Sequence, residues 1–158
     1  NFYWFGREPQ YRDIKPQIFA EQYMQNSDQG LHDYKVWCFN GKALYTQYIT
    51  GRIGNETYEA FYDRDWNKQD FTYHNPLMTG NAPRPEKLEE LLKCAERLAK
   101  GLPFARVDFY VLEDGNIKFG EITFCPMSGF QEWRPEKMDL VFGEMLNIDD
   151  QTRQENSI

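Results

Sequence analysis

The sequence predicts an α+β domain, and two hairpin signals and one amphipathic segment support that prediction. Asn40-Gly41 and Asp114-Gly115 each stand between runs rich in aromatic and β-branched residues. Such dipeptides favour type I′ turns, which join two antiparallel strands through a two-residue loop. Residues 85–100 place leucine and alanine at helical spacing, with a proline at the start and a glycine directly after the end. Antiparallel hairpins with separate helices are typical of the α+β class.

Length and composition favour one domain. The 158 residues suffice for a single hydrophobic core. We expect an irregular N-terminal segment over residues 1–17, the folded domain over residues 18–148 and a frayed tail over residues 149–158.

The charge and the cysteine content limit the classes of protein to which this chain can belong. The net charge of −7 argues against general nucleic-acid binding. The three cysteines lack metal-ligand spacing, and their odd number fits free thiols in a reducing compartment. The chain shows neither a secretory leader nor an apolar run of about 18 residues. We therefore expect a cytoplasmic protein without membrane insertion, and the initial Asn suggests a fragment of a longer chain.

The N-terminal part carries weak signals. Arg7 and Glu8 are interpreted as an ordinary surface ion pair. Residues 18–24, IFAEQYM, predict a short strand, and residues 26–30 predict a polar turn. Glu21 stands within this mostly apolar strand, where a buried carboxylate needs a hydrogen-bond donor.

The first hairpin is predicted over residues 33–50. A two-residue loop fixes the opposed pairs as Phe39 with Lys42, Cys38 with Ala43, and Trp37 with Leu44. Lys35 shares a strand face with Trp37 and Phe39. Its ammonium group either extends to solvent or contacts an anion in a cleft.

The middle of the chain predicts a strand, a long loop and a helix. Residues 58–63 suit a strand, whereas residues 64–84 show no period and are expected to form a functional loop. The helix at residues 85–100 follows, and a shorter helix is expected at residues 135–146.

The second hairpin is predicted to bring two carboxylates together. A two-residue loop at Asp114-Gly115 fixes the opposed pairs on one face as Leu112 with Ile117, Tyr110 with Phe119, Asp108 with Glu121, and Arg106 with Thr123. Two opposed carboxylates have Cβ atoms about 5 Å apart and destabilise the sheet unless something compensates.

Three kinds of compensation are open for Asp108 and Glu121. Arg106 alone can neutralise them, or they can share a proton as a general acid/base pair. The third is a divalent cation, because Mg²⁺ is held by one or two carboxylates together with substrate phosphates. An arginine beside such a site suits phosphate oxygens, and Thr123 adds a neutral oxygen, so we favour metal plus phosphate. A surface hairpin with a salt bridge is the simpler alternative.

A family resemblance extends along the chain. The segments are R-E at 7–8, K-P-x-I-x-x-E-x-Y at 15–23, D-Y-K-x-x-C-F-N-G-K at 33–42, D-x-D-W at 63–66, R-V-D-F-Y at 106–110 and F-G-E-I-T-F at 119–124. Together with E-x-T-x-x-P at 121–126 and a following glycine, they resemble the teichuronopeptide-biosynthesis (TupA-like) branch of the ATP-grasp ligases. The chain is similar to the C-terminal lobe of that domain.

This resemblance implies ATP and Mg²⁺ as cofactors and an amide-forming reaction through an acyl phosphate. It implies that Asp108, Glu121 and Thr123 hold metal and that Arg106 stabilises the transferring phosphoryl group. It also implies nucleotide contacts, at the adenine for Glu21, Gln22, Tyr23 and Met24 and at the ribose for Asp33. Lys35, by its place on the strand, is a further candidate to contact an anion of the nucleotide. The partners implied are a small-molecule or saccharide-linked carboxylate, an amine acceptor, and an N-terminal lobe of the same protein.

One residue departs from the family motif. Thr123 replaces the usual Asn, and a hydroxyl is a weaker neutral ligand than an amide carbonyl.

The alternatives belong to other functional classes. One is a glycosyltransferase in which Asp108 and Glu121 hold the metal ion of a nucleotide-sugar. Another is a carbohydrate-binding module rich in aromatics. Four residues of the central region are candidates to touch the acceptor, although each also suits a solvated loop: Arg52, Asp63, Arg64 and Trp66.

Overall fold

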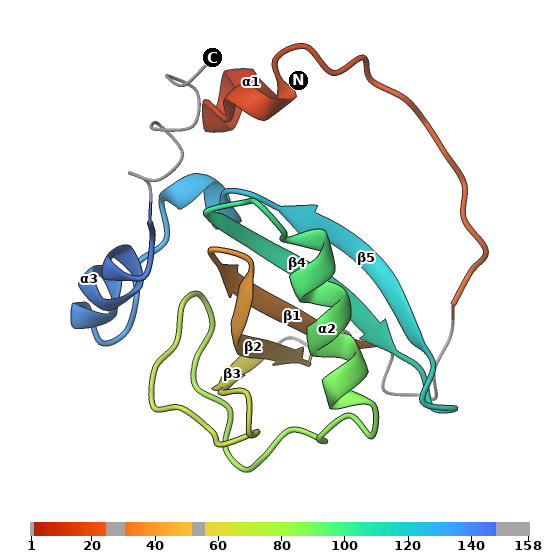
Figure 1. The fold of residues 1–158 in the computed structure, drawn as a ribbon, viewed down its shortest axis with the longest axis vertical. Helices are drawn as coiled ribbons and strands as arrows, with labels where there is room; N and C mark the ends of the chain where they lie inside the picture. Colours follow the sequence, from red (N-terminus) through yellow and green to blue (C-terminus); the bar gives the residue numbers. More distant parts are fainter. Residues whose placement is uncertain (1, 25–30, 52–55, 148–158) are drawn as a thin grey trace.

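A computed structural model describes residues 2–24, 31–51 and 56–147. Its centre is a five-stranded antiparallel sheet with the strand order β3-β2-β1-β4-β5 (Figure 1). The strands are β1 (His32–Phe39), β2 (Lys42–Thr50), β3 (Tyr58–Tyr62), β4 (Phe104–Val111) and β5 (Ile117–Thr123). Helices accompany this sheet, so the predicted α+β class is confirmed.

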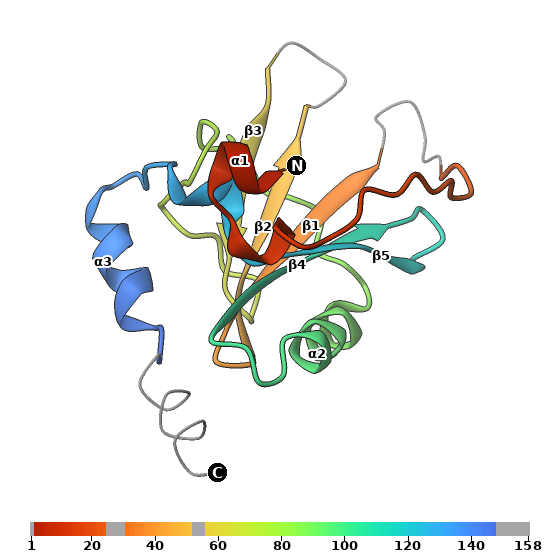
Figure 2. The ribbon, with the colours of Figure 1, turned by 90° about the horizontal axis from the view of Figure 1, so that it is seen from above.

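One long helix covers one face of the sheet. Figure 2 shows this helix, α2 (Leu88–Leu98), on one side of the sheet. Its buried leucines pack against residues of the central strands. The other helical elements are α1 (Phe2–Gly6), η1 (Pro9–Tyr11), η2 (Pro126–Gly129) and α3 (Lys137–Glu144). No helix among the described residues is long and apolar enough to cross a membrane.

The core between the sheet and α2 is aliphatic and aromatic. Alternate residues of β1 point into it, including Tyr34, Val36 and Cys38, and they meet Leu91 and Ala95 of the helix. Burial, with Glu96 nearby, raises the pKa of the Cys38 thiol to about 12. Cys38 is therefore a packing residue, since a thiol with that pKa stays protonated and unreactive.

The other residues of β1 face the opposite side of the sheet. At one end of this face, Trp37 and Phe39 join a second buried cluster, which also contains Phe61, Phe71, Tyr73, Trp133, Met138 and Phe142. Trp133 stacks on Phe142 of α3 with ring centroids 4.1 Å apart. At the other end the same strand carries Asp33 and Lys35, so β1 links an aromatic half and a charged half of one face.

The first hairpin has the predicted turn and one unpredicted bulge. Asn40 and Gly41 both have positive φ, at 50° and 75°, as a type I′ turn requires. Phe39 pairs with Lys42 and Cys38 with Ala43, as predicted. Trp37 then pairs with Tyr45, because Leu44 is an extra residue in a bulge. The predicted Trp37–Leu44 pair is therefore wrong.

The second hairpin has a three-residue loop instead of the predicted two-residue loop. The Leu112 amide donates to the Asn116 carbonyl over 2.9 Å, and only Gly115 in the loop has positive φ. Pairing near the turn is thus offset by one, and Tyr110 faces Lys118 rather than Phe119. A bulge at Gly120 removes the offset, so that Asp108 faces Glu121 and Arg106 faces Thr123 as predicted.

The N-terminal region differs from the sequence-based expectation. Residues 1–17, expected to be irregular, contain α1 and η1. Residues 18–24 form no strand, because no described sheet edge pairs with them, and Ile18 and Phe19 are exposed. Glu8 is buried and accepts hydrogen bonds from Gln10 and Ser128, so it is not a surface ion-pair residue.

The remaining expectations are met in outline. Residues 64–84 form a loop with isolated bridges, and α2 and α3 lie within the predicted helices. The predicted turn at residues 26–30 and the predicted tail at residues 149–158 lie outside the described residues.

Candidate functional site

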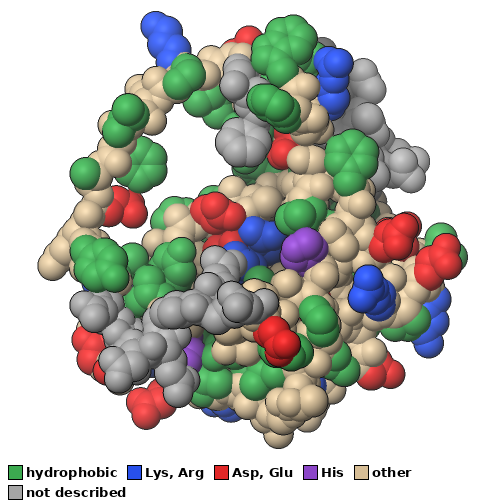
Figure 3. All heavy atoms as spheres, turned by 180° about the vertical axis from the view of Figure 1, so that it is seen from behind, with side chains coloured by type: hydrophobic (Ala, Val, Ile, Leu, Met, Phe, Trp, Pro, Cys, Tyr) green, Lys and Arg blue, Asp and Glu red, His purple; other side chains and the backbone are tan. Residues whose placement is uncertain are grey.

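A cleft of about 500 Å³ lies on the face of the sheet opposite α2. Its walls come from β1, β2, β4 and β5 and from the loop after β3. Figure 3 views this face, where acidic and basic side chains and a histidine gather near the middle of the surface. The cleft thus lies over the charged half of the face.

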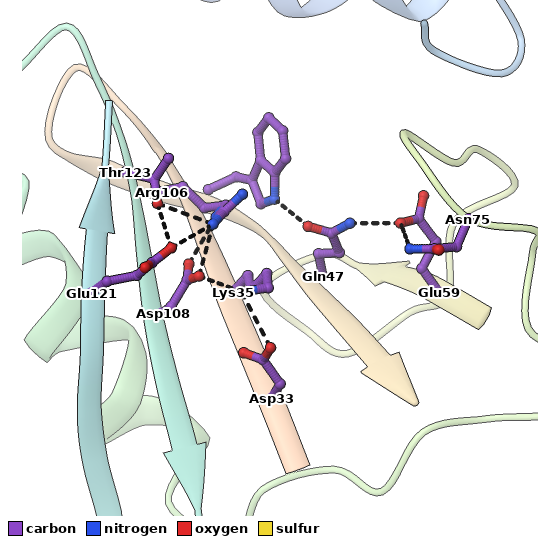
Figure 4. A network of polar contacts seen from close by, with 10 residues as sticks. Asp33, Lys35, Gln47, Glu59, Asn75, Arg106, Asp108, Glu121 and Thr123 are labelled. Carbon is purple, nitrogen blue, oxygen red and sulfur yellow. Dashed lines mark hydrogen bonds and ion pairs between the residues drawn. The ribbon is translucent and has the colours of Figure 1, made fainter. Parts of the chain in front are cut away.

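The predicted carboxylate pair lies in this cleft with Arg106 between its members (Figure 4). The Arg106 guanidinium donates to both Asp108 carboxylate oxygens over 2.8 Å and to Glu121 Oε1 over 3.0 Å. The same Nη2 lies 3.0 Å from Thr123 Oγ1, and the Thr123 hydroxyl donates to Glu121 Oε1 over 2.9 Å. These four residues form one connected group, as the inner pairs of the hairpin predict.

Two further predicted residues extend this group across β1. Lys35 lies directly opposite Asp108 in the register, and its ammonium donates to Asp108 Oδ2. It also lies 3.2 Å from Asp33 Oδ2. Lys35 is therefore not extended to solvent, since it is 8% exposed and lies between two carboxylates.

Burial differs sharply along this network. Asp33 and Asp108 are each 3% exposed, whereas the Glu121 side chain is 63% exposed. The network has three carboxylates and two cations, so it carries a net charge of −1 when all five groups are ionised. A buried network of this kind needs each charge paired, and Glu121 is the member that is open to an incoming ligand.

Arg106 compensates both carboxylates in this geometry, as in the first of the three alternatives, and Lys35 adds a second cation at Asp108. The described residues hold no group of three or more His, Cys, Asp or Glu side chains arranged for a metal ion. Mg²⁺ requires fewer protein ligands when nucleotide phosphates supply the others. Asp108, Glu121 and the Thr123 hydroxyl fit that smaller donor set, and only Oε1 of Glu121 takes part in the contacts described above.

The predicted adenine-binding residues lie on an extended segment beside the cleft. Glu21 lines the cleft, whereas Gln22 and Tyr23 are exposed and Met24 is half-buried. The Tyr23 side chain is 83% exposed. The structure therefore brings Glu21 to the cleft and leaves Gln22 and Tyr23 on the surface.

Two of the four candidate acceptor residues of the central region contact the opposite side of the sheet. Arg64 pairs with Glu96 of α2 over 2.7 Å, and Trp66 stacks on Tyr62 with centroids 4.3 Å apart. Asp63 accepts hydrogen bonds from the amides of Asp65 and Asn67 and so shapes the turn. Arg64 and Trp66 thus contact residues on the α2 side, Asp63 stabilises the turn, and Arg52 lies outside the described residues.

Sequence reasoning missed a second polar network at the same cleft. Its centre is Glu59 of β3, which is completely buried and contacts Gln47 and Asn75 (Figure 4). The available signal was the acidic residue inside the apolar strand Tyr58–Tyr62, because a carboxylate there needs donors. Nothing in the sequence indicated that the donors come from the loop.

Comparison with known proteins identifies the family. No curated protein and no solved structure matches the chain. The model of the family described as TupA-like ATPgrasp matches residues 1–147, which include both polar networks and the whole sheet. The chain therefore belongs to the TupA-like ATP-grasp family, a group of ATP-grasp ligases.

Proposed function

We propose that this chain carries the metal- and phosphate-binding part of an ATP- and Mg²⁺-dependent carboxylate–amine ligase. In the reaction, a carboxylate oxygen takes the γ-phosphoryl group of ATP and ADP leaves. The amine nitrogen then attacks the carbonyl carbon of the acyl phosphate, and inorganic phosphate leaves as the amide bond forms. The TupA-like relationship supports bacterial cell-envelope polysaccharide synthesis as the setting and a saccharide-linked carboxylate as a substrate.

The observation that carries this proposal is the group of Arg106, Asp108, Glu121 and Thr123 at the cleft. Mg²⁺ at Asp108 and Glu121 would neutralise charge on the phosphates as it moves between them. Arg106 lies beside both carboxylates and holds two donors in a fork that matches phosphate oxygens. Phosphoryl transfer depends mainly on such positioning and charge stabilisation.

The neighbouring residues supply binding rather than chemistry. Lys35 adds a second cation to the floor of the cleft, between Asp33 and Asp108. Asp33 forms an ion pair with Lys35 over 3.2 Å and remains our candidate for the ribose contact. Glu21 lines the cleft, and Gln22, Tyr23 and Met24 remain candidates for the adenine contact. Because Thr123 offers a hydroxyl in place of an amide carbonyl, we expect one metal position to be weak.

Nucleotide titration of the full-length protein tests this proposal. We expect MgATP to bind at least tenfold more tightly than ATP in the presence of a chelator, and Asp108→Asn to remove most of that difference. A protein that prefers a nucleotide-sugar over ATP would be a glycosyltransferase. A protein that binds saccharides and ignores every nucleotide would be a carbohydrate-binding module. Either result would replace the ligase assignment.

A further inference from the structure

The cleft has two chemically distinct halves. Its floor over β1, β4 and β5 is charged, and includes Lys35, Arg106 and Glu121. Its wall comes from β2, from the residue before β3 and from the loop after β3, and the described residues that line it are Gln47, Ile49, Thr57, Tyr73, His74 and Asn75. None of these six is a carboxylate, a lysine or an arginine. A ligand that fills this cleft therefore needs a charged part and an uncharged polar part.

We propose that His74 and Asn75 form a subsite for the hydroxyl groups of a sugar ring and that Glu59 is the residue that positions them. This inference rests on the proposed function, because it assigns the second half of the same cleft. The ring is either the ribose of the nucleotide or the saccharide of the carboxylate substrate. Both present vicinal hydroxyls, which each donate and accept hydrogen bonds.

Glu59 is a buried carboxylate surrounded by neutral donors. Its Oε1 accepts from the backbone amides of Tyr73 and His74, the latter over 2.9 Å. Its Oε2 accepts from Gln47 Nε2 over 2.7 Å and from Asn75 Nδ2 over 3.3 Å. A carboxylate removed from water without such donors would destabilise the fold strongly. These contacts therefore fix three consecutive loop residues against β2 and β3.

Other contacts hold the same loop at both ends. The backbones of Thr72 and Arg134 exchange two hydrogen bonds of 2.8 Å, and the Tyr73 hydroxyl donates to the Pro126 carbonyl over 2.8 Å. Downstream, the Glu59 amide donates to the Pro76 carbonyl over 3.0 Å. The segment 72–76 is thus a rigid strap, and rigid placement of polar groups at a cleft reduces the entropic cost of binding.

The side chains that the strap presents suit hydroxyl groups. His74 is exposed at the cleft, and a neutral imidazole offers one donor and one acceptor. Asn75 uses its Nδ2 on Glu59, which leaves its carbonyl oxygen as an acceptor. Gln47 differs, since its carbonyl accepts from Trp37 and its amide donates to Glu59, so it supports the wall rather than contacting the ligand.

The chain offers a direct spectroscopic test because it contains only two histidines. His32 lies away from the strap, with its Nδ1 2.8 Å from the Tyr48 hydroxyl, and serves as an internal reference. We would record the imidazole NMR signals of the full-length protein with MgATP, with magnesium tripolyphosphate and with glucuronate, a simple saccharide carboxylate. We expect a sugar-bearing probe to move the His74 signals, and tripolyphosphate and the His32 signals to show no comparable change.

The outcomes separate the two sources and the two proposals. A response to MgATP that magnesium 2′,3′-dideoxy-ATP does not reproduce assigns the ribose hydroxyls, and a response to glucuronate alone assigns the saccharide. His74 signals that move equally with tripolyphosphate would overturn the subsite, because the wall would then bind phosphate. If MgATP binds and neither sugar-bearing probe moves His74, the subsite is wrong while the ligase assignment stands. If MgATP does not bind at all, the proposed function itself fails.

Variants test the positioning role of Glu59. We expect His74→Ala and Asn75→Ala each to weaken binding of the responsive sugar probe about tenfold and to leave magnesium tripolyphosphate affinity unchanged. In Glu59→Gln the new NH2 group is a donor that faces the amide donors of Gln47 and Asn75, so these contacts are lost. We therefore expect weaker binding of the sugar probe and unchanged tripolyphosphate affinity here too. Glu90→Gln, on the exposed side of α2, is the matched control and should bind both probes normally. Sugar binding unchanged in both His74→Ala and Asn75→Ala would refute the subsite even if Glu59→Gln fails to fold.

Discussion

The two hairpins begin from the same sequence signal and reach different geometries. Asn40-Gly41 forms the two-residue turn that the signal predicts, and the strands separate from the prediction only at Leu44, further along. Asp114-Gly115 lies in a three-residue loop, and the pairing is restored by Gly120. A turn dipeptide therefore locates a hairpin reliably, whereas a single bulge decides which side chains face each other several residues away.

The hairpins also differ in the side chains that they place on the face opposite α2, because the turn end of the first is aromatic and the inner end of the second is charged. The first hairpin lies at the centre of the sheet and places Trp37 in the aromatic cluster. The second includes the edge strand β5 and carries Asp108 and Glu121 at the cleft. We therefore expect a change at Trp37 in the first hairpin to alter stability, and a change at Glu121 in the second hairpin to alter activity.

The largest expected effect is on stability, in the first hairpin. Trp37 is 3% exposed and contacts the rings of Phe61, Tyr73, Phe104 and Trp133. Trp37→Ala should lower the free energy of unfolding by about 3–5 kcal/mol, because it leaves a cavity among these rings. Urea denaturation of the wild type and the variant measures the difference. A loss below about 1 kcal/mol would contradict the structural role of this hairpin.

The next effect is on activity, in the second hairpin. In the full-length enzyme, Glu121→Gln removes a proposed anionic metal ligand, and a loss of about 3 kcal/mol of transition-state stabilisation lowers the rate roughly a hundredfold. The matched control, Glu113→Gln, changes an exposed residue near the turn and should retain activity. The two variants should unfold at similar denaturant concentrations, because Gln keeps the shape of Glu. Equal activities at saturating ATP and Mg²⁺ would return this hairpin to a structural role.

A smaller effect is expected at the bulge that sets the second register. A Cβ at Gly120 would lie 3.1 Å from the Asp108 carbonyl oxygen and 3.4 Å from the Tyr110 ring. Gly120→Ala should therefore destabilise the protein by about 1–2 kcal/mol, because backbone and ring must move. Gly143→Ala is the control, since that glycine is helical with open space around it and should be neutral or slightly stabilising. Thermal melts of both variants distinguish the two positions.

The smallest effect concerns the bulged side of the first hairpin. Glu96 accepts from the Ala43 amide and from Arg64, and although burial opposes it, these hydrogen bonds and the charges of Arg64 and Lys42 lower the pKa of Glu96. A carboxyl group whose pKa is lower in the folded than in the unfolded protein stabilises the fold when the pH is above the ordinary, unfolded pKa. That contribution is lost as the pH falls through the pKa of the folded state. Glu96→Gln should thus cost less than about 1 kcal/mol at pH 7, and this cost should shrink towards zero as the pH falls below the lowered pKa of Glu96. A cost that grows towards acid would have the wrong sign.

The parts of the site that could be predicted depend on local pairing. Asp108 faces Glu121 because both lie on the strands of one hairpin, and the loop and bulge offsets cancel between them. Tyr110 was paired wrongly because the sequence does not distinguish a two-residue from a three-residue loop at Asp-Gly. The contacts of Glu59 with His74 and Asn75 could not be predicted, since a loop without periodicity gives no direction to its side chains. The metal and nucleotide roles remain predictions that the expected outcomes above test.

Strand β5 is an edge strand of the sheet, and its bulge at Gly120 affects how the folded protein behaves in concentrated solution. An exposed, regular margin offers a row of amides and carbonyls to which another chain can add. Gly120 interrupts that row, and the charged side chains of Lys118 and Glu121 flank the interruption. At the other margin, β3 is bridged to Leu77 and Lys68 of the following loop. The bulge that aligns the two carboxylates thus also hinders edge-to-edge aggregation of the folded protein.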